Sequence, residues 1–204
     1  IIIIYINKIR GINMINKLPK IELHCHLDGS VRVDTIIDIA KKENIKLESY
    51  EKCDVEKLVQ VPNDCTSLNE YLKRFDLANK VMQSRENIKR VTFELLEDAQ
   101  KENVKYIEVR FAPLLHLNGG LSIEEVIQSA IDGINEAEKM YDIKGNIILC
   151  CMRTMSEDDA ILVVEEGKKF LNKGVVAIDL AGPEEEGFVK KYKKLVHKLI
   201  YSIE

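Results

Sequence analysis

The sequence has no tryptophan, only 4 prolines and no C-x-x-C pair among its 5 cysteines. An odd cysteine count without such pairs argues against a disulfide framework and against a cysteine zinc knuckle. The first apolar run is about six residues long, far short of the roughly 20 residues that cross a bilayer. The start also lacks the order of a signal peptide. We therefore expect no membrane partner and a reducing, cytoplasmic location.

No face of one charge is evident, because 30 basic and 34 acidic residues are mixed along the chain. A phosphate backbone needs a basic patch or stripe, so nucleic acid is not an expected partner. A hydrophobic content of 46% is ordinary for a globular chain with a core. The first methionine is Met14, and we expect residues 1–16 to be an N-terminal extension without function, followed by one unit over residues 17–204.

Short apolar runs of β type alternate with longer segments of helical spacing. The β-type runs cover residues 21–27, 104–113, 146–153 and 175–182. The helical segments cover residues 33–44, 67–83, 84–103, 122–143, a stretch after Ser156, and 188–204. Two of these helices begin with a capping-box pattern, Ser122 with Glu125 and Ser156 with Asp159.

This alternation predicts an α/β fold with parallel strands buried between helices. A doubly wound sheet and a (β/α) barrel both fit the pattern. No glycine-rich dinucleotide fingerprint and no phosphate loop follows a strand, which favours the barrel. A whole barrel takes about 250 residues, so four strands predict a TIM-type barrel of which only about the first four strand–helix units are present.

The motif His24-Cys25-His26 ends the first apolar run, in the stretch IELHCHLDGS. Residues i and i+2 of a strand point to the same face, so the two imidazoles are predicted to project together. Zinc accepts imidazole nitrogen readily, but a catalytic zinc site uses three or more protein ligands. Asp28 follows in a tight turn and places a carboxylate beside this pair. Without further context, the motif also fits a chance pair on a strand.

Four segments in order resemble the adenosine deaminase family: KIELHCHLDGS, YIEVRFAP, ILCCMR and VVAIDLAGPE. The resemblance covers about residues 17 to 190 and identifies residues 17–204 as the N-terminal portion of such a barrel domain. It implies a hydrolase with one Zn²⁺ per active site. The implied reaction converts adenosine or deoxyadenosine and water to inosine or deoxyinosine and ammonia, in purine salvage.

The resemblance also implies roles for individual residues. His24 and His26 correspond to two zinc ligands, and Asp28 to the carboxylate that binds the ribose 5′-hydroxyl. Gly182 corresponds to a glycine whose backbone N–H meets a purine ring nitrogen, although by itself it also fits a plain turn at the end of a strand.

A lid helix over the substrate is implied for the segment that begins at Ser67. The corresponding apolar residues are Leu68, Tyr71, Leu72 and Phe75. Tyr71 stands where the family usually has phenylalanine. On spacing alone, the same residues fit the buried stripe of an ordinary helix.

Several groups that the family uses have no counterpart in this sequence. They are a third zinc histidine and a glutamate in an H-A-G-E motif, a histidine after strand six, and a pair of aspartates on strand eight. His116 has no counterpart as a ligand. We therefore assign no catalytic residue within this chain and expect a chain truncated before strand five and inactive, or nearly so, by itself.

Three alternatives stay open. The first is a deaminase of another purine, such as adenine or a modified adenosine; the aspartate after the histidine pair favours a ribosyl substrate. The second is a metal-dependent phosphoesterase, which needs further histidines and carboxylates that the next strands do not supply. The third is a non-catalytic half barrel that binds a purine.

Overall fold

The computed structural model describes residues 17–183 and Lys193. The predicted extension over residues 1–16 lies outside this range, and so does the predicted helix over residues 188–204 except for Lys193.

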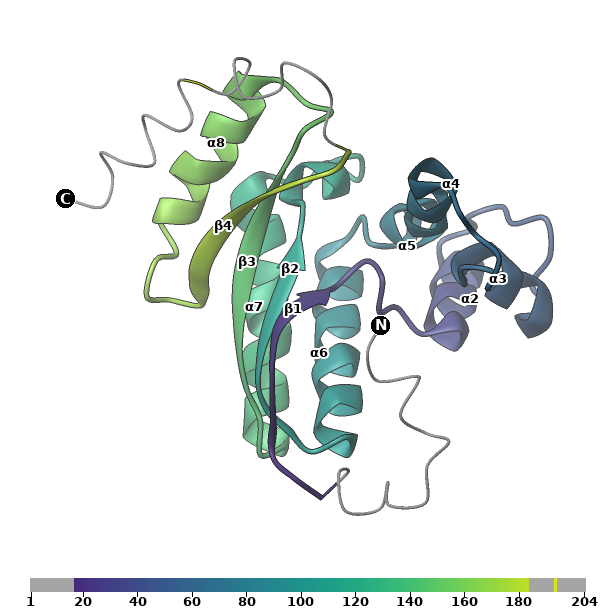
Figure 1. The fold of residues 1–204 in the computed structure, drawn as a ribbon, viewed down its shortest axis with the longest axis horizontal. Helices are drawn as coiled ribbons and strands as arrows, with labels where there is room; N and C mark the ends of the chain where they lie inside the picture. Colours follow the sequence, from purple (N-terminus) through teal and green to yellow (C-terminus); the bar gives the residue numbers. More distant parts are fainter. Residues whose placement is uncertain (1–16, 184–192, 194–204) are drawn as a thin grey trace.

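Four parallel strands form one sheet in chain order, β1-β2-β3-β4 (Figure 1). They are β1 (Lys20–His26), β2 (Val104–Phe111), β3 (Lys144–Met152) and β4 (Val175–Ala181). The four predicted strands are confirmed, with ends that differ by at most two residues. A doubly wound sheet reverses its strand order at a switch point, and the described sheet has no such reversal. The sheet therefore has the order of successive units of a (β/α) barrel.

Helices lie on one face of this sheet. The described helices are α2 (Val33–Lys42), α3 (Lys52–Val59), α4 (Leu68–Leu72), α5 (Asp76–Val81), α6 (Arg85–Lys101), α7 (Ile123–Met140) and α8 (Glu157–Lys168), with 3-10 turns η2 (Lys73–Phe75) and η3 (Pro113–His116). Helices α6, α7 and α8 pack on β2, β3 and β4, whereas α2 to α5 gather to one side, near the end of β1 (Figure 1). Among residues 17–183, none of the helices combines the length and apolar character that a membrane span requires.

Two helix predictions need correction. Residues 67–83 do not form one helix, because the 3-10 turn η2 separates α4 from α5. At this break the Phe75 ring packs near the rings of Tyr71 and His26, so tertiary contacts accompany the tighter turn. Helix α3 was not predicted, since only Val55 in its eight residues is buried and its apolar periodicity is weak.

Both predicted capping boxes are present. In α7, the Ser122 hydroxyl accepts from the Glu125 amide and the Glu125 carboxylate accepts from the Ser122 amide. Ser156 and Asp159 make the same pair of bonds at the start of α8. These side chains satisfy backbone N–H groups that have no partner within the helix.

The two faces of the sheet differ in polarity. On the face that α6 and α7 cover, alternate residues of β2 and β3 are fully buried and apolar: Ile107, Val109, Ile147 and Leu149. On the opposite face, Tyr106 donates to Glu108 and accepts from Asn146 at 2.8 and 3.0 Å. The apolar face holds the core, and the polar face is available for chemistry.

Gly133 of α7 lies directly against α6. A Cβ atom at this position would lie 2.5 Å from the backbone oxygen of Lys89 and 2.8 Å from Cβ of Thr92. Neither atom belongs to a flexible side-chain end, so a larger residue must push the two helices apart.

We predict that Gly133→Ala lowers the free energy of unfolding by about 2 kcal/mol, because overpacking outweighs the roughly 1 kcal/mol by which alanine favours a helix. Urea denaturation measures this change. Asn135→Ala, at an exposed position of the same helix, is the control and should change stability by no more than about 0.5 kcal/mol. A Gly133→Ala chain as stable as the wild type would contradict the close approach.

Candidate active site

The strand β1 contains a bulge just before its end. Glu22 pairs with Ile107 and Cys25 pairs with Val109, so an advance of three residues along β1 matches an advance of two residues along β2. The amide of His24 donates to the Glu22 carboxylate at 2.9 Å. A bulge re-aims side chains at the end of a strand, and here it sets the direction of His24.

The imidazoles of His24 and His26 face a common point. Their ring centroids lie 5.6 Å apart with an interplanar angle of 60°. Nη1 of Arg110 contacts Nε2 of both rings, at 3.2 Å for His26 and more closely for His24. The structure therefore brings the two predicted ligands together at the carboxyl end of β1, with Nε2 as the atom that each ring presents.

Arg110 of β2 is the residue that the sequence interpretation missed. It pairs directly with His26 in the sheet and is only 6% exposed. Its Nε and Nη2 atoms lie 3.3 and 3.2 Å from Sγ of Cys150, and Nη2 forms an ion pair with Asp179. One guanidinium thus contacts β1, β3 and β4. A charged residue inside the apolar run YIEVRFAP, and another inside VVAIDLAG, were the available signals.

The surroundings of His24 and of Cys150 shift the pKa of each side chain. Burial lowers the pKa of His24, and the nearby Arg110 and His26 act in the same direction, against Asp179 and Glu22. The neutral imidazole is the form that binds a metal ion. Burial raises the pKa of Cys150 to about 11, so its thiol stays protonated at neutral pH and is a poor metal ligand.

The imidazole nitrogens of His24 and His26 could supply two of the ligands of a metal ion. Two imidazole nitrogens directed at one point match the nitrogen donors that zinc uses. Within residues 17–183, however, no cluster of three or more His, Cys, Asp or Glu side chains could hold a metal ion. A complete site needs donors from outside the described part of the chain.

A cavity of about 270 Å³ opens beside His26. Its lining includes His26, Asp28, Leu72, Phe75, Cys150 and Gly182. These residues come from the ends of β1, β3 and β4 and from the α4–η2 segment. The carboxyl ends of barrel strands are where barrel enzymes carry their active sites.

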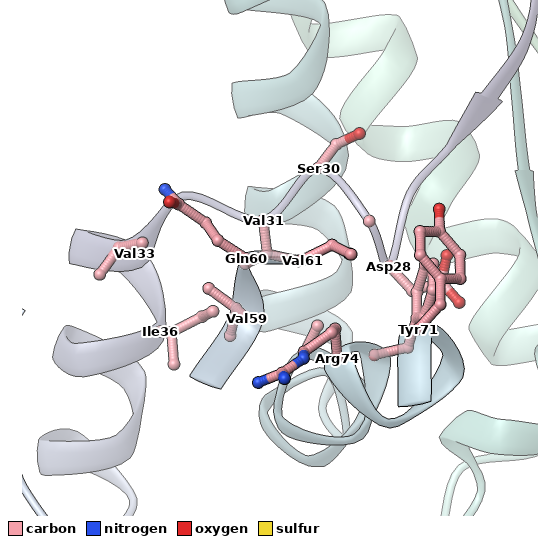
Figure 2. Close-up of a pocket in the computed structure, with 13 residues that line it drawn as sticks. Asp28, Ser30, Val31, Val33, Ile36, Val59, Gln60, Val61, Tyr71 and Arg74 are labelled. Carbon is pink, nitrogen blue, oxygen red and sulfur yellow. The ribbon is translucent and has the colours of Figure 1, made fainter. Parts of the chain in front are cut away.

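Asp28 lines both this cavity and a second one of about 280 Å³, whose lining residues are drawn in Figure 2. Its Oδ1 atom is buried without a hydrogen-bond partner in the described part of the chain. The Nδ1 atom of His26 is 3.6 Å away, beyond hydrogen-bond distance. A buried carboxylate oxygen without a donor is costly, so this atom is suited to a donor from a ligand.

The four residues of the predicted lid differ in their position relative to the two cavities. Leu72 lines the first cavity, Tyr71 lines the second, and Phe75 lines both. Tyr71 and Asp28 both line the second cavity (Figure 2). Leu68 is 55% exposed and lines neither cavity. The structure therefore brings three of the four to the cavities, and a contact between Leu68 and substrate stays a prediction.

Gly182 follows β4 and has a φ of +100°, which a residue with a side chain rarely adopts. Its carbonyl oxygen accepts from the Arg153 guanidinium at 2.7 Å. The positive φ, and not a lack of space, favours glycine here, because a Cβ would find its nearest atoms at an ordinary contact distance of 3.7 Å. The positive φ sets the direction of the backbone at the edge of the first cavity.

His116 lies in η3 and lines neither cavity. It is 1% exposed, and its Nδ1 atom lies 3.0 Å from the backbone oxygen of Met82. Its ring packs against Phe111 with the centroids 5.6 Å apart. Burial lowers the pKa of His116 to about 4. This histidine belongs to the core.

Residues 19–200 match the family described as adenosine deaminase. An adenosine deaminase from Clostridium botulinum (strain 657 / Type Ba4) is 62% identical over 180 residues, which are 88% of this chain and 54% of the relative. One from Clostridium perfringens (strain 13 / Type A) is 61% identical over 184 residues, or 90% of this chain and 55% of the relative. The chain thus spans about half the length of these curated relatives.

Solved structures share the fold. Arabidopsis ADAL complexed with IMP is 28% identical with a TM-score of 0.78, and the match covers 93% of this chain and 57% of that one. An adenine deaminase from Arthrobacter aurescens gives 22% identity and a TM-score of 0.77, over 90% and 55% of the two chains. An amidohydrolase from Burkhoderia ambifaria, with bound Zn, is 23% identical with a TM-score of 0.77, and the match covers 91% of this chain and 52% of that one.

We predict that His116 makes the folded state sensitive to acid. Its folded pKa of about 4 lies below the ordinary value of 6.5, so the unfolded chain binds the proton more readily. The stability that results is fully present above about pH 6.5 and is lost as the pH falls toward 4. Between pH 7 and pH 5 the wild type should lose about 2 kcal/mol through this group.

Urea denaturation of the wild type and of His116→Gln at both pH values isolates this contribution. Glutamine keeps a donor for the Met82 carbonyl but does not titrate. The wild type should lose about 2 kcal/mol more than the variant over this pH range. Equal losses in the two chains would show that His116 is accessible to protons in the folded state.

Proposed function

The chain belongs to the adenosine deaminase family, and from this premise we propose that it carries the N-terminal half of a zinc-dependent site for hydrolytic deamination. The proposed substrates are adenosine and deoxyadenosine, which react with water to give inosine or deoxyinosine and ammonia, as part of purine salvage. The observation that carries the proposal is the cavity at the end of β1. His26 and Asp28, with its buried Oδ1, line this cavity, and the imidazole of His24 converges with that of His26 on Nη1 of Arg110.

His24 and His26 would hold one Zn²⁺ through their Nε2 atoms. When bound, zinc supplies the Lewis acidity that brings the pKa of water toward neutrality and so provides a nucleophile. The lowered pKa of His24 favours its neutral imidazole, which is the form that binds a metal ion, and Nη1 of Arg110 contacts Nε2 of both rings.

The remaining cavity residues would bind and orient the nucleoside. Asp28 would accept a hydrogen bond from the ribose 5′-hydroxyl through its otherwise unpaired Oδ1. The backbone N–H of Gly182, which lines the same cavity, would donate to a purine ring nitrogen. Leu72 and Phe75 line the cavity from the lid segment and would exclude water from the reacting carbon.

Asp28 also favours a nucleoside over a nucleotide or a free base. A 5′-phosphate would bring two like charges together in a site where the carboxylate is only 13% exposed. A free base would leave Oδ1 without a donor. The IMP and GMP complexes belong to ADAL, which is 28–29% identical to this chain.

The general acid, the third histidine and the aspartate ligand would come from sequence that this chain does not contain. We therefore propose that the 204-residue chain binds a purine nucleoside weakly and does not turn it over. The mixed charge argues against a nucleic-acid partner. The 5 free cysteines support the proposal of a reducing cytoplasm.

We predict that the contact from Asp28 is visible in binding. The wild-type chain should bind adenosine about tenfold or more tightly than 5′-deoxyadenosine, because a hydrogen bond to a charged group contributes about 1.5–3 kcal/mol. In Asp28→Asn that difference should fall to about threefold or less, as expected for a neutral acceptor. Isothermal titration calorimetry of both ligands against both chains measures this.

Ser30→Ala is a matched control in the same turn, since its hydroxyl donates to the backbone oxygen of His26 and has no proposed contact with ribose. It should keep the full preference for adenosine. A preference that survives Asp28→Asn would assign the 5′-hydroxyl contact to another residue. Tighter binding of free adenine than of adenosine would favour the adenine deaminase alternative.

We predict that the purified chain, supplied with Zn²⁺, forms no more inosine from adenosine than His24→Ala does. The reason is that a proton donor for the purine ring is missing, and general acid–base catalysis contributes about 10²–10⁴-fold. The absorbance change from adenosine to inosine follows the reaction. Turnover that depends on His24 would overturn the proposed inactivity and leave the proposed chemistry standing.

A further inference from the structure

The guanidinium of Arg110 occupies a position that the proposed function does not explain. It is almost fully buried, and its Nη1 atom lies between the Nε2 atoms of His24 and His26. Its other nitrogens contact Cys150 and Asp179. A charge on the polar face of the sheet is thus in contact with both proposed metal ligands.

The chemistry of this contact is specific. Arginine has five N–H donors and no acceptor, and it stays protonated in proteins. To accept from Nη1, each imidazole must be neutral with a lone pair on Nε2 and its proton on Nδ1. A metal ion bound at Nε2 uses the same lone pair. Arg110 and a metal ion therefore compete for the same two acceptors.

Asp179 is a partner of the Arg110 guanidinium that does not depend on the imidazoles. It is the carboxylate paired with Arg110, and it lies opposite Cys150 in the β3–β4 register. Cys150, with its protonated thiol, offers an acceptor without a full charge. These groups give the guanidinium partners that remain when its contacts with the imidazoles are lost.

We propose that Arg110 is a positioning residue for the metal ligands. Its Nη1 holds both imidazoles in the tautomer that presents Nε2, and it withdraws onto Asp179 and Cys150 when a metal ion binds. The inference rests on the proposed zinc site. Arg110 then fixes the direction of both rings before the metal binds. Its competition for Nε2 lowers the metal affinity, and the ion pair with Asp179 reduces this loss of affinity.

A merely structural ion pair gives a different expectation. If Arg110 and Asp179 only held β2 and β4 together, removing either side chain would weaken both the fold and the metal site. Under our proposal the two substitutions act in opposite directions on zinc affinity. Arg110→Met removes the group that competes with zinc for Nε2. Asp179→Asn removes the charged partner of the guanidinium, so Arg110 leaves the imidazoles less readily.

The first measurement needs no metal. Two-bond ¹⁵N–¹H correlation spectra report which ring nitrogen of each histidine carries the proton. At pH 8 the metal-free wild-type chain should show His24 and His26 with the proton on Nδ1, and Arg110→Met should shift both toward Nε2. Wild-type rings with the proton on Nε2 would overturn the proposal without any variant.

The second measurement is zinc affinity, from competition with a chromophoric chelator. We expect Arg110→Met to bind Zn²⁺ about tenfold more tightly than the wild type and Asp179→Asn about tenfold more weakly. In the double variant, Asp179→Asn should have a smaller effect, because it acts through Arg110. Tyr106→Phe, on the same face of β2, is the control and should leave the affinity unchanged.

Binding that survives in His24→Ala and His26→Ala is assigned to other groups, such as exposed thiols, and is subtracted. If zinc perturbs the His24 and His26 signals but Arg110→Met does not bind more tightly, the inference is wrong and the proposed zinc site stands. If zinc leaves both rings unperturbed in every chain, the proposed zinc site itself fails. Urea denaturation confirms that each variant is folded, and Arg110→Gln, which removes the charge and keeps a polar side chain, replaces Arg110→Met if that chain is unfolded, with the same expected gain in zinc affinity.

Discussion

The parallel pairing of β1, β2, β3 and β4 in chain order is the constraint on which the rest of the structure depends. Parallel strands place all their carboxyl ends at one edge of the sheet, so His26, Cys150 and Gly182 line one cavity although they are far apart in the sequence. Helices can cover only one face of such a sheet if the strands belong to a barrel. The other face keeps its polar side chains, and the candidate site forms at its end.

The buried charge of Arg110 connects these strands on the polar face. A guanidinium that is 6% exposed requires acceptors from its neighbours, and it finds them on β1, β3 and β4. Its ion pair with Asp179 lies next to the two imidazoles, which links the electrostatics of the ligand pair to a strand more than 150 residues later in the chain. The direction of the two imidazoles therefore depends on side chains from all four strands.

The chain spans about half the length of its curated relatives, and the described residues likewise contain only part of a metal site. The described residues include two imidazoles that face a common point, the buried carboxylate of Asp28 and the cavity that His26 and Asp28 line. The described part of the chain does not contain a complete set of metal donors. Family membership thus rests on sequence over nearly the whole chain, while activity remains a proposal about groups that lie elsewhere.

The sequence by itself determined the four strands, the two capping boxes and the pair His24 and His26, because these depend on local periodicity or on neighbours within a few residues, and the alternation of strands with helices indicated the parallel arrangement. Tertiary structure alone decided the bulge that aims His24, the contacts of Arg110 with Asp179, the break before α5 and the exposed position of Leu68. Each of these depends on which side chains meet across strands or between segments, and no local pattern encodes such a meeting. The physical reason is that a buried charge or an aromatic ring is placed by the partners that satisfy it, and those partners are distant in sequence.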